Sequence, residues 1–542
     1  MRLSRAITDS IAKRPQDTVM IYPGRDISGE EFLALTASCA LALKEKGIKA
    51  GDWVAVCSTT TAEAVAAAIA CHNIGAAVMM VNPAVSDGTI RSILKDSGTR
   101  LIFVHEMLID RIRQGLKGSG IETGVIISDM DSMPAALKLL RGFGVIPHNE
   151  ITSISGMEFV VWNEFIKKTD PDDAVRILDE TEEETDPETP ALLVWSSGST
   201  GEPKGVLLSE RALLAQLNIT GFDPFTDKGT AFAALGSLWS ATAYIITILV
   251  MLVMPRKIVM PLGQPMTDLI TKQGADMVFS TASGWIRTIS SGSLDKADIS
   301  RLEFTACGGE RTAPAAERAV NAYFREHGCR CELTDLWGLS EFSSLMTDNI
   351  SNNKKGSVGR PFHGIRIEAF DPVRPSLPLE RGHSGELFAE SPAVMSGYYG
   401  DDKATEEFFF TDEEGVVWGR TGDAGYVDSE GYVYVYGRRD SAIYPDGVSV
   451  VYPSEIENVL AEDARVLNCA VVISGAGGEI TAHIYASAQD ETEQAALTDT
   501  LKGLCKSRLS KDRRPERYIY WPKGLPLNEF GKIARNELKE YT

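Results

Sequence analysis

The chain has 542 residues, of which 44% are hydrophobic and 24% charged, and its formal net charge is −21. These proportions are those of a soluble globular protein and exclude a disordered chain, a collagen and a disulfide-rich miniprotein. A field of that sign repels polyanions, so we expect no nucleic-acid partner, although a local cationic pocket for a small anion is still allowed.

The cysteines and the N-terminus favour a cytoplasmic protein. The 8 cysteines are scattered through mostly apolar segments, and only Cys329 and Cys331 lie close together, without the partners that a zinc site needs. We therefore expect reduced, buried thiols. The first twelve residues are polar and amphipathic and contain no apolar stretch typical of a signal peptide.

The N-terminal region predicts helices that alternate with strands. Residues 28–46 predict a helix, because Ser28 is a suitable N-cap and Glu31 completes a capping box. The next predicted elements are a strand at 52–57, a helix at 61–74 and strands at 77–81 and 101–104. This alternation predicts βαβ units and a parallel sheet, and no Rossmann-type glycine fingerprint accompanies it.

An acidic segment, residues 179–190, follows this region and reads as an exposed linker. A predicted strand at 191–195 then leads into the loop Ser196 to Gly205, which is rich in glycine and small hydroxyls. Glycine lets backbone N–H groups approach phosphate oxygens, the hydroxyls add donors, and Lys204 adds positive charge. The loop suits a triphosphate, although its order of residues is not that of a Walker A loop.

An uncharged stretch follows, from Gly229 to Pro255, and it is nearly all apolar between residues 241 and 254. Its length and composition fit either a transmembrane helix or a buried core helix. After residue 437 the pattern changes to a compact α+β unit, with a boundary near Asp440. Its predicted elements are strands at 448–451, 469–473 and 480–485 and helices at 453–461 and 491–509.

The loop at 196–205 resembles the phosphate-binding signature of the adenylate-forming superfamily, and it meets all the fixed positions of that signature. The superfamily includes acyl-CoA synthetases, adenylation domains and firefly luciferase, and the chain is most similar to an acid–CoA ligase. The resemblance implies a nucleotide-binding role for Ser196, Ser197, Gly198, Ser199, Thr200, Gly201 and Lys204.

Further motifs of the family follow in order. The segment Trp337-Gly-Leu-Ser-Glu341 resembles its aromatic-G-x-[ST]-E motif. The resemblance implies that Trp337 lies against adenine, that Ser340 meets the α-phosphate and that Glu341 binds Mg²⁺. A carboxylate is the natural protein ligand of such a hard cation.

Two other segments complete the nucleotide site that the resemblance implies. Asp423, in Arg-Thr-Gly-Asp, would accept hydrogen bonds from both ribose hydroxyls, and Arg438 would contact the ribose or a phosphate. Asp440 falls at the family's hinge position. The residues Gly308, Gly309 and Glu310 resemble a stretch that lies beside the nucleotide and the substrate.

The segment from Gly385 to Gly397-Tyr-Tyr also resembles the family, and we interpret it as structural strand and turn rather than as part of the site. Near the C-terminus, the segment ending in Gly531-Lys532 resembles the motif whose lysine reaches into the active site during adenylation. Lys532 is therefore our candidate for offsetting charge on the α-phosphate. Because Lys204 and Glu341 must meet on one ATP, a membrane crossing between them is excluded, and the uncharged stretch is predicted to be a core helix without a transmembrane segment.

The sequence departs from the family at two places that concern the substrates. No Asp lies between Thr230 and Pro255 to pair a substrate ammonium, so we expect an apolar fatty or aryl acid, with Trp239 and Ser240 lining its pocket. After Asp440 the usual Gly-Gly is reduced to a single glycine, Gly447. The loop does not decide between free CoA and the phosphopantetheine arm of an acyl carrier protein.

The resemblance implies an α/β fold with a large multi-subdomain N-terminal domain, residues 1–437, that has mixed sheets and helices. A small mobile α+β C-terminal domain, residues 438–542, is joined to it by a hinge. The implied reaction uses ATP and Mg²⁺ to convert a small-molecule carboxylic acid into acyl-AMP and then transfers the acyl group to a thiol, most simply CoA. Lys532, Ser340, Glu341 and Lys204 would act in catalysis.

Two alternatives keep the fold and change the outcome: an enzyme that loads a carrier protein, and a catalytically silent nucleotide-binding protein. The intact residues Lys204, Glu341, Asp423 and Lys532 argue against the silent alternative. The sequence does not identify the carboxylic acid or the oligomeric state.

Overall fold

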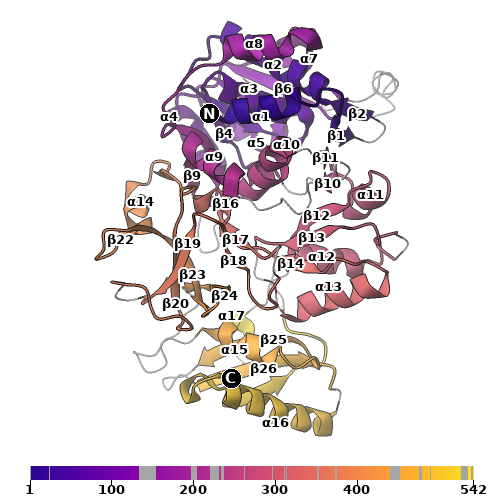
Figure 1. Cartoon of the computed structure of the whole chain (residues 1–542), viewed down its shortest axis with the longest axis vertical. Helices are drawn as coiled ribbons and strands as arrows, with labels where there is room; N and C mark the ends of the chain where they lie inside the picture. Colours follow the sequence, from indigo (N-terminus) through magenta and orange to yellow (C-terminus); the bar gives the residue numbers. More distant parts are fainter. Residues whose placement is uncertain are drawn as a thin grey trace.

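The fold is described from a computed structural model of the chain (Figure 1). The structure describes residues 2–22, 25–132, 154, 156–196, 204–219, 231–233, 237–254, 256–261, 263–295, 297–309, 312, 314–350, 353–372, 375–439, 452–474, 479–488, 490–526, 535–538 and 541. Structural statements below concern these residues.

An eight-stranded sheet forms the top of the molecule in Figure 1, with the order β21-β9-β8-β4-β3-β5-β6-β7. Its strands are β3 (Trp53–Cys57), β4 (Ala77–Met80), β5 (Leu101–His105), β6 (Thr123–Ile127), β7 (Glu158–Val161), β8 (Pro190–Trp195), β9 (Gly205–Ser209) and β21 (Gly397–Tyr398). The strands from β8 to β7 run parallel, which confirms the predicted βαβ units. Strands β9 and β21 pair antiparallel at one edge of the sheet. Strand β9 begins at Gly205, where the glycine-rich loop of residues 196–205 ends.

Helices cover both faces of this sheet. One face carries α2 (Gly29–Glu45) and α3 (Ala62–Asn73), and the other carries α4 (Asp87–Asp96) and α5 (Ile109–Leu116). The predicted capping box at the start of α2 is present, because the Ser28 hydroxyl accepts from the Glu31 N–H while the Glu31 carboxylate accepts from the Ser28 N–H.

A seven-stranded sheet lies beside the first, with the order β14-β13-β12-β10-β11-β1-β2. Its strands are β1 (Thr18–Tyr22), β2 (Arg25–Ser28), β10 (Ala231–Ala233), β11 (Lys257–Val259), β12 (Met277–Ser280), β13 (Phe304–Cys307) and β14 (Leu333–Asp335). Helices α12 (Ala282–Ser290) and α13 (Pro314–Glu326) pack on it through Trp285 and Phe324, whose rings meet edge to face. Apart from the antiparallel pair of β1 and β2, the neighbouring strands of this sheet run parallel. The carboxyl ends of β12, β13 and β14 therefore lie at the same edge of the sheet.

The uncharged stretch is a buried helix, as predicted. A π-helical segment, Thr242–Val250, continues into the short helix α10 (Met251–Val253), and its residues from Ala243 to Leu252 are buried in the main core. Tyr244 forms a hydrogen bond with His72 of α3, 3.1 Å between Oη and Nε2. In the part of the chain that the structure describes, no helix has the length and apolar character to cross a membrane.

A five-stranded antiparallel sheet, drawn in orange in Figure 1, follows in the chain. Its strands are β19 (Arg366–Phe370), β20 (Gly385–Glu390), β22 (Phe409–Thr411), β23 (Val417–Val427) and β24 (Val433–Arg438). Asp423 and Arg438 lie directly opposite each other in β23 and β24. Pairing of these two strands therefore brings together two of the predicted site residues.

The C-terminal region forms a smaller domain with its own core, at the bottom of Figure 1. It contains α15 (Pro453–Leu460), β25 (Val466–Ser474), β26 (Glu479–Ala486), α16 (Glu491–Arg508) and β27 (Arg517–Tyr520). The predicted helices and two of the predicted strands are confirmed, whereas β27 was not predicted. Asp440 and the predicted strand at 448–451 lie outside the described residues, so the boundary between 437 and 438 stays a prediction.

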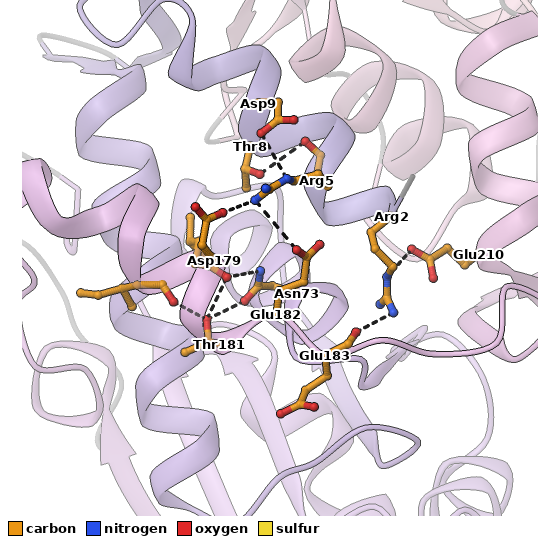
Figure 2. A network of polar contacts seen from close by, with 12 residues as sticks. Arg2, Arg5, Thr8, Asp9, Asn73, Asp179, Thr181, Glu182, Glu183 and Glu210 are labelled. Atoms are coloured by element: carbon orange, nitrogen blue, oxygen red, sulfur yellow. Dashed lines mark hydrogen bonds and ion pairs between the residues drawn. The ribbon is translucent and has the colours of Figure 1, made fainter.

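The acidic segment at 179–190 is mostly exposed, as predicted for a linker, but it also makes contacts with the N-terminal helix (Figure 2). Its first residues end helix α8 (Ala174–Thr181), and Asp179 pairs with Arg5 of helix α1 (Leu3–Ala12). The Arg2 guanidinium donates to the carbonyl of Glu183, 2.6 Å, and pairs with Glu210, 2.9 Å. The prediction missed these contacts because the cations precede the acidic residues by more than 170 positions.

The cysteines match the prediction. All 8 are free, 7 of them are buried, and Cys331 is partly buried. Cys329 and Cys331 are neighbours in space as well as in sequence, with their sulfur atoms 3.2 Å apart.

Candidate active site

A cleft of roughly 1560 Å³ lies between the larger and the smaller domain, since Asn458 of α15 and Arg508 of α16 line it together with residues of both N-terminal sheets. The described candidates that line the cleft are Ser196, Lys204, Trp239, Ser240, Gly309, Trp337, Ser340, Glu341, Asp423 and Arg438. The candidates Ser197, Gly198, Ser199, Thr200, Gly201, Glu310, Asp440 and Lys532 lie outside the described residues. The structure therefore brings together residues that are scattered over more than 240 positions of the chain.

The glycine-hydroxyl loop is closed at its base by two hydrogen bonds. The backbone N–H of Ser196 donates to the carbonyl of Lys204, 2.9 Å, and the N–H of Lys204 donates to the hydroxyl of Ser196, 3.0 Å. Trp195 and Gly205 are paired in the antiparallel ladder of β8 and β9. Sequence and pairing together thus make residues 196–204 the connection of a hairpin whose base lies in the cleft.

A tight hairpin presents Ser340 and Glu341 to the cleft. Strands β15 (Gly338–Leu339) and β16 (Ser344–Leu345) pair closely, and a Cβ on Gly338 would lie 1.7 Å from the carbonyl oxygen of Ser344. Only glycine fits there. Two non-glycine residues with positive φ lie at the end of the connection and the start of β16, Ser343 at 55° and Ser344 at 103°. Backbone strain of this kind is typically held in place at functional sites.

Glu341 places a buried carboxylate at the cleft wall. Its Oε1 atom accepts a hydrogen bond from the Tyr398 hydroxyl, 2.9 Å, and its backbone carbonyl accepts from the Met395 N–H, 2.7 Å. Burial and the neighbouring Glu341 carboxylate raise the pKa of Tyr398 well above its ordinary value, so this hydroxyl stays a donor. The Ser340 hydroxyl lies 3.5 Å from the carbonyl oxygen of Trp195.

The buried carboxylate of Glu341 would be one oxygen ligand for a divalent ion and, as far as the described residues go, its other ligands would have to come from outside the protein. No group of three or more His, Cys, Asp or Glu side chains suited to a metal occurs within the described parts of the chain. A hard cation held by one carboxylate completes its coordination with phosphate oxygens and water, as is usual for magnesium.

Asp423 is a buried carboxyl of the cleft with a raised pKa. It is 8% exposed, accepts from the Trp337 indole N–H at Oδ2, 2.9 Å, and accepts from Arg438 at Oδ1, 3.3 Å. Burial raises the pKa of Asp423 to about 6, against the opposing influence of Arg438 and Trp337. Each oxygen of an ionised carboxylate has a second lone pair, so Asp423 keeps room for two further donors.

The two glycines of the 305–310 segment have different positions. Gly309 has a φ of +78° and lines the cleft. A Cβ on Gly308 would lie 2.9 Å from the carbonyl oxygen of Leu336 and 3.0 Å from the ring of Phe279. Gly308 therefore allows β13 to pack closely against the residue that precedes Trp337, which is a structural contribution to the site.

The two residues predicted to line the acyl pocket, Trp239 and Ser240, both lie on the cleft. Trp239 and Ser240 line the cleft together with Asn82 and Thr242. The carbonyl of Trp239 accepts from the backbone N–H of Trp195, 3.5 Å, which ties this wall to the end of β8.

Tyr398 is a cleft residue that the sequence interpretation missed. The Gly397-Tyr-Tyr segment forms strand β21 (Gly397–Tyr398) and a turn at Tyr399, as predicted, and Tyr398 lines the cleft, which the sequence interpretation did not expect. Its neighbour Tyr399 packs instead against Trp53, with ring centroids 6.4 Å apart. Two adjacent tyrosines give no local signal of which one faces the site, and the pairing of β21 with β9 decides it.

Known proteins are similar to this chain over nearly its whole length. The family model described as AMP-binding enzyme matches residues 7–399. A fatty acid–[acyl-carrier-protein] ligase, ScoC of Streptomyces coeruleorubidus, is 27% identical and the alignment covers 97% of this chain and 93% of ScoC. An indoleacetate–CoA ligase of Aromatoleum aromaticum is 25% identical, and the alignment covers 100% of this chain and 98% of that ligase.

Solved structures share the fold. Apo MatB from Rhodopseudomonas palustris superposes with a TM-score of 0.78 at 20% identity, covering 100% of this chain and 99% of MatB. The anthranilate CoA ligase AuaEII in complex with anthranoyl-AMP gives a TM-score of 0.73 at 19% identity, covering 100% of this chain and 97% of AuaEII. The α/β architecture with a large N-terminal and a smaller C-terminal domain is therefore confirmed.

Proposed function

Because the chain belongs to the AMP-binding enzyme family, we propose that it activates an apolar carboxylic acid with ATP and transfers the acyl group to a thiol. In the first step a carboxylate oxygen attacks the α-phosphorus, the bond to pyrophosphate breaks, and acyl-AMP forms. In the second step the thiol sulfur attacks the acyl carbon, AMP leaves, and the thiol proton passes to solvent. Two easier displacements thereby replace one difficult condensation.

The proposal rests above all on the convergence of Lys204, Ser340, Glu341, Asp423 and Arg438 in one cleft of a chain with a net charge of −21. In our assignment the two cations face phosphate oxygens, and Asp423 accepts the ribose hydroxyls. Glu341 holds Mg²⁺, which when bound would neutralise phosphate charge. Trp337 is assigned to the adenine, and its indole N–H orients Asp423 for the ribose.

The role of Lys532 rests on its motif alone, since it lies outside the described residues. We assign it to the carboxylate and the α-phosphate during adenylation, with movement of the smaller domain about Asp440 separating the two steps. A Lys532→Ala variant tests the assignment, because an undiminished rate of adenylation in this variant would contradict it.

An apolar acid is supported by the sequence from Thr230 to Pro255, which contains no Asp to pair a substrate ammonium, and by the uncharged residues of this stretch that line the cleft, Trp239, Ser240 and Thr242. A buried substrate ammonium would need a counter-charge there. Two of the similar proteins are named for a fatty acid and for indoleacetate, which are acids of this class.

For the thiol we favour free CoA, in line with the names of most of the similar ligases. A carrier-protein thiol is the second candidate. It is supported by the similarity to ScoC, named as an acyl-carrier-protein ligase.

The decisive experiment is carboxylate-dependent exchange between pyrophosphate and ATP, screened over fatty, aryl and small polar acids. We expect exchange with an apolar acid. Lys204→Gln should lower it by about 10- to 100-fold, because a hydrogen bond to a charged group contributes about 1.5–3 kcal/mol. Lys46→Gln is the matched control, since Lys46 is partly exposed and pairs with Glu158.

Each outcome of the screen has a distinct meaning. Binding of ATP without exchange for any acid would contradict the proposed reaction and favour a silent nucleotide-binding protein. Exchange only with small polar acids would overturn the substrate class alone. Comparing thioester formation with free CoA and with a phosphopantetheinylated carrier protein then identifies the acceptor.

A further inference from the structure

We propose that Tyr398 is a positioning residue that fixes both charged groups facing the nucleotide phosphates, Glu341 through its hydroxyl and Lys204 through its ring. This inference rests on the proposed function, because it assumes that these two groups meet the phosphates and their cation. It concerns a residue that lies between them and needs no contact with the nucleotide itself.

The hydroxyl contact is directional. Tyr398 Oη donates to Oε1 of Glu341 at 2.9 Å, and the carboxylate is 9% exposed. A carboxylate that accepts one fixed donor has a set orientation, and its other oxygen is left for a cation. Because metal ligands are oriented by the groups around them, loss of such a donor typically weakens metal binding.

The ring of Tyr398 contacts the positively charged group, the ammonium of Lys204. The ammonium of Lys204 lies 4.8 Å from the centroid of the Tyr398 ring, within the range of a cation–π interaction. Lys204 is an exposed residue near the end of the glycine-rich loop of residues 196–205, and its side chain is long and flexible. The ring face therefore limits the positions that the ammonium can take.

One neutral side chain thus contacts both charged groups. A lysine and a glutamate that met directly would neutralise each other and leave neither charge for the phosphates and the cation. Tyr398 contacts both groups, Glu341 through its hydroxyl at 2.9 Å and Lys204 through its ring at 4.8 Å.

The tyrosine itself is held firmly. It is paired with Val206 across β21 and β9, its backbone N–H donates to the Thr405 hydroxyl at 2.9 Å, and its ring meets Phe408 edge to face at 6.1 Å. A side chain with two rotatable bonds, fixed at its backbone and along its ring, can transmit its position to the groups that it touches.

Two substitutions separate the two contacts. Tyr398→Phe removes the hydroxyl and keeps the ring, so binding of the divalent cation should weaken while the KM for ATP at saturating Mg²⁺ changes less than about twofold. Tyr398→Leu removes both, so it should in addition raise the KM for ATP by several-fold. Tyr399→Phe is the matched control, since it makes the same chemical change on the neighbouring side chain that packs against Trp53.

The cation is measured without turnover, by the electron paramagnetic resonance of Mn²⁺ titrated into the full-length protein with a non-hydrolysable ATP analogue. We expect Tyr398→Phe to raise the Kd of Mn²⁺ by about 10- to 100-fold, the usual loss of metal affinity when a group that orients a metal ligand is removed. Tyr399→Phe should leave that Kd unchanged. Circular dichroism confirms that each variant is folded before it is compared.

An unchanged Mn²⁺ Kd in Tyr398→Phe, or an equal change in Tyr399→Phe, would overturn the proposal. A wild-type protein that binds Mn²⁺ and the ATP analogue yet shows no pyrophosphate exchange contradicts the proposed function instead. The two failures are therefore distinguishable.

Discussion

Two clusters of charged residues lie in the N-terminal domain, and they use their charges in opposite ways. In the network of Figure 2, Arg5 contacts Asp9, Asp179 and Glu182, and most of these side chains are at least 40% exposed. In the cleft, Glu341 and Asp423 are about nine-tenths buried, and each accepts a hydrogen bond from an aromatic side chain.

The difference shows what marks a site in this molecule. Exposed acids and bases that pair with one another gain little, since solvent and salt screen them. A buried carboxylate that is oriented by neutral donors keeps most of its charge for another molecule. Burial of a charged carboxylate costs free energy, and the raised pKa of Asp423 reflects this cost, because burial raises that pKa despite the nearby Arg438.

The largest effect is expected from the same substitution made once in each cluster. Asp423→Asn should lower kcat/KM for ATP by about 10²-fold, because it removes the charge that pairs Arg438 and one acceptor for the ribose. Asp9→Asn, in the exposed network, should leave kcat/KM unchanged. Equal effects in the pyrophosphate-exchange assay would remove the proposed distinction between the clusters.

The pH dependence of ATP binding sharpens the comparison. The pKa of Asp423 is raised to about 6, so below that pH the protonated carboxyl no longer accepts two hydroxyl donors. The Kd of ATP, measured by calorimetry, should rise as the pH falls through 6, by up to about tenfold per pH unit. The contribution of Asp423 to folding has the opposite sign: it is most favourable below its ordinary pKa and is lost as the pH rises through 6.

Two variants control the pH experiment. Trp337→Phe removes a donor to the Asp423 carboxylate, so the midpoint of the Kd profile should move to higher pH. Arg2→Ala should leave the midpoint in place. A profile that is flat between pH 5 and 8 in the wild type would contradict the assignment of Asp423 to the ribose.

Arg2 is more buried than Arg5, with 17% of its side chain exposed against 40%, and its replacement should have a moderate effect on stability. Its guanidinium pairs with Glu210 and donates to the carbonyls of Glu183 and His72. Arg2→Ala leaves the buried Glu210 carboxylate without this cation, at a cost of about 1–3 kcal/mol. Amide hydrogen exchange in α1 should accelerate by roughly 10- to 100-fold, while kcat/KM for ATP stays at the wild-type value.

The smallest effect is expected at Arg5. Its contacts with Asp179 and Asp9 are exposed ion pairs, so Arg5→Ala should cost less than about 1 kcal/mol. The difference in hydrogen exchange from the wild type should shrink further in 0.5 M salt. A loss as large as that of Arg2→Ala would show that exposure is the wrong criterion for ranking these pairs.

Local residue chemistry predicted much of the fold. The capping box at Ser28 and Glu31 and the alternation of helices and strands up to His105 appear as expected, because both signals lie within a few residues of the chain. The burial of the apolar stretch at 242–253 required a second argument, that Lys204 and Glu341 share one ligand. Strand β27 was missed because it pairs with β26 only after the intervening helix α16 returns the chain to the sheet.

The sequence by itself determined which chemical groups the site contains, since Lys204, Ser340, Glu341, Asp423 and Arg438 each belong to a short motif whose residue types suit a nucleotide. Tertiary structure alone decided how these groups are held. The bond from Trp337 to Asp423 spans 86 positions, and that from Tyr398 to Glu341 spans 57. Such contacts depend on strand pairing and on the burial of whole sheets, so no local pattern of residues can specify them.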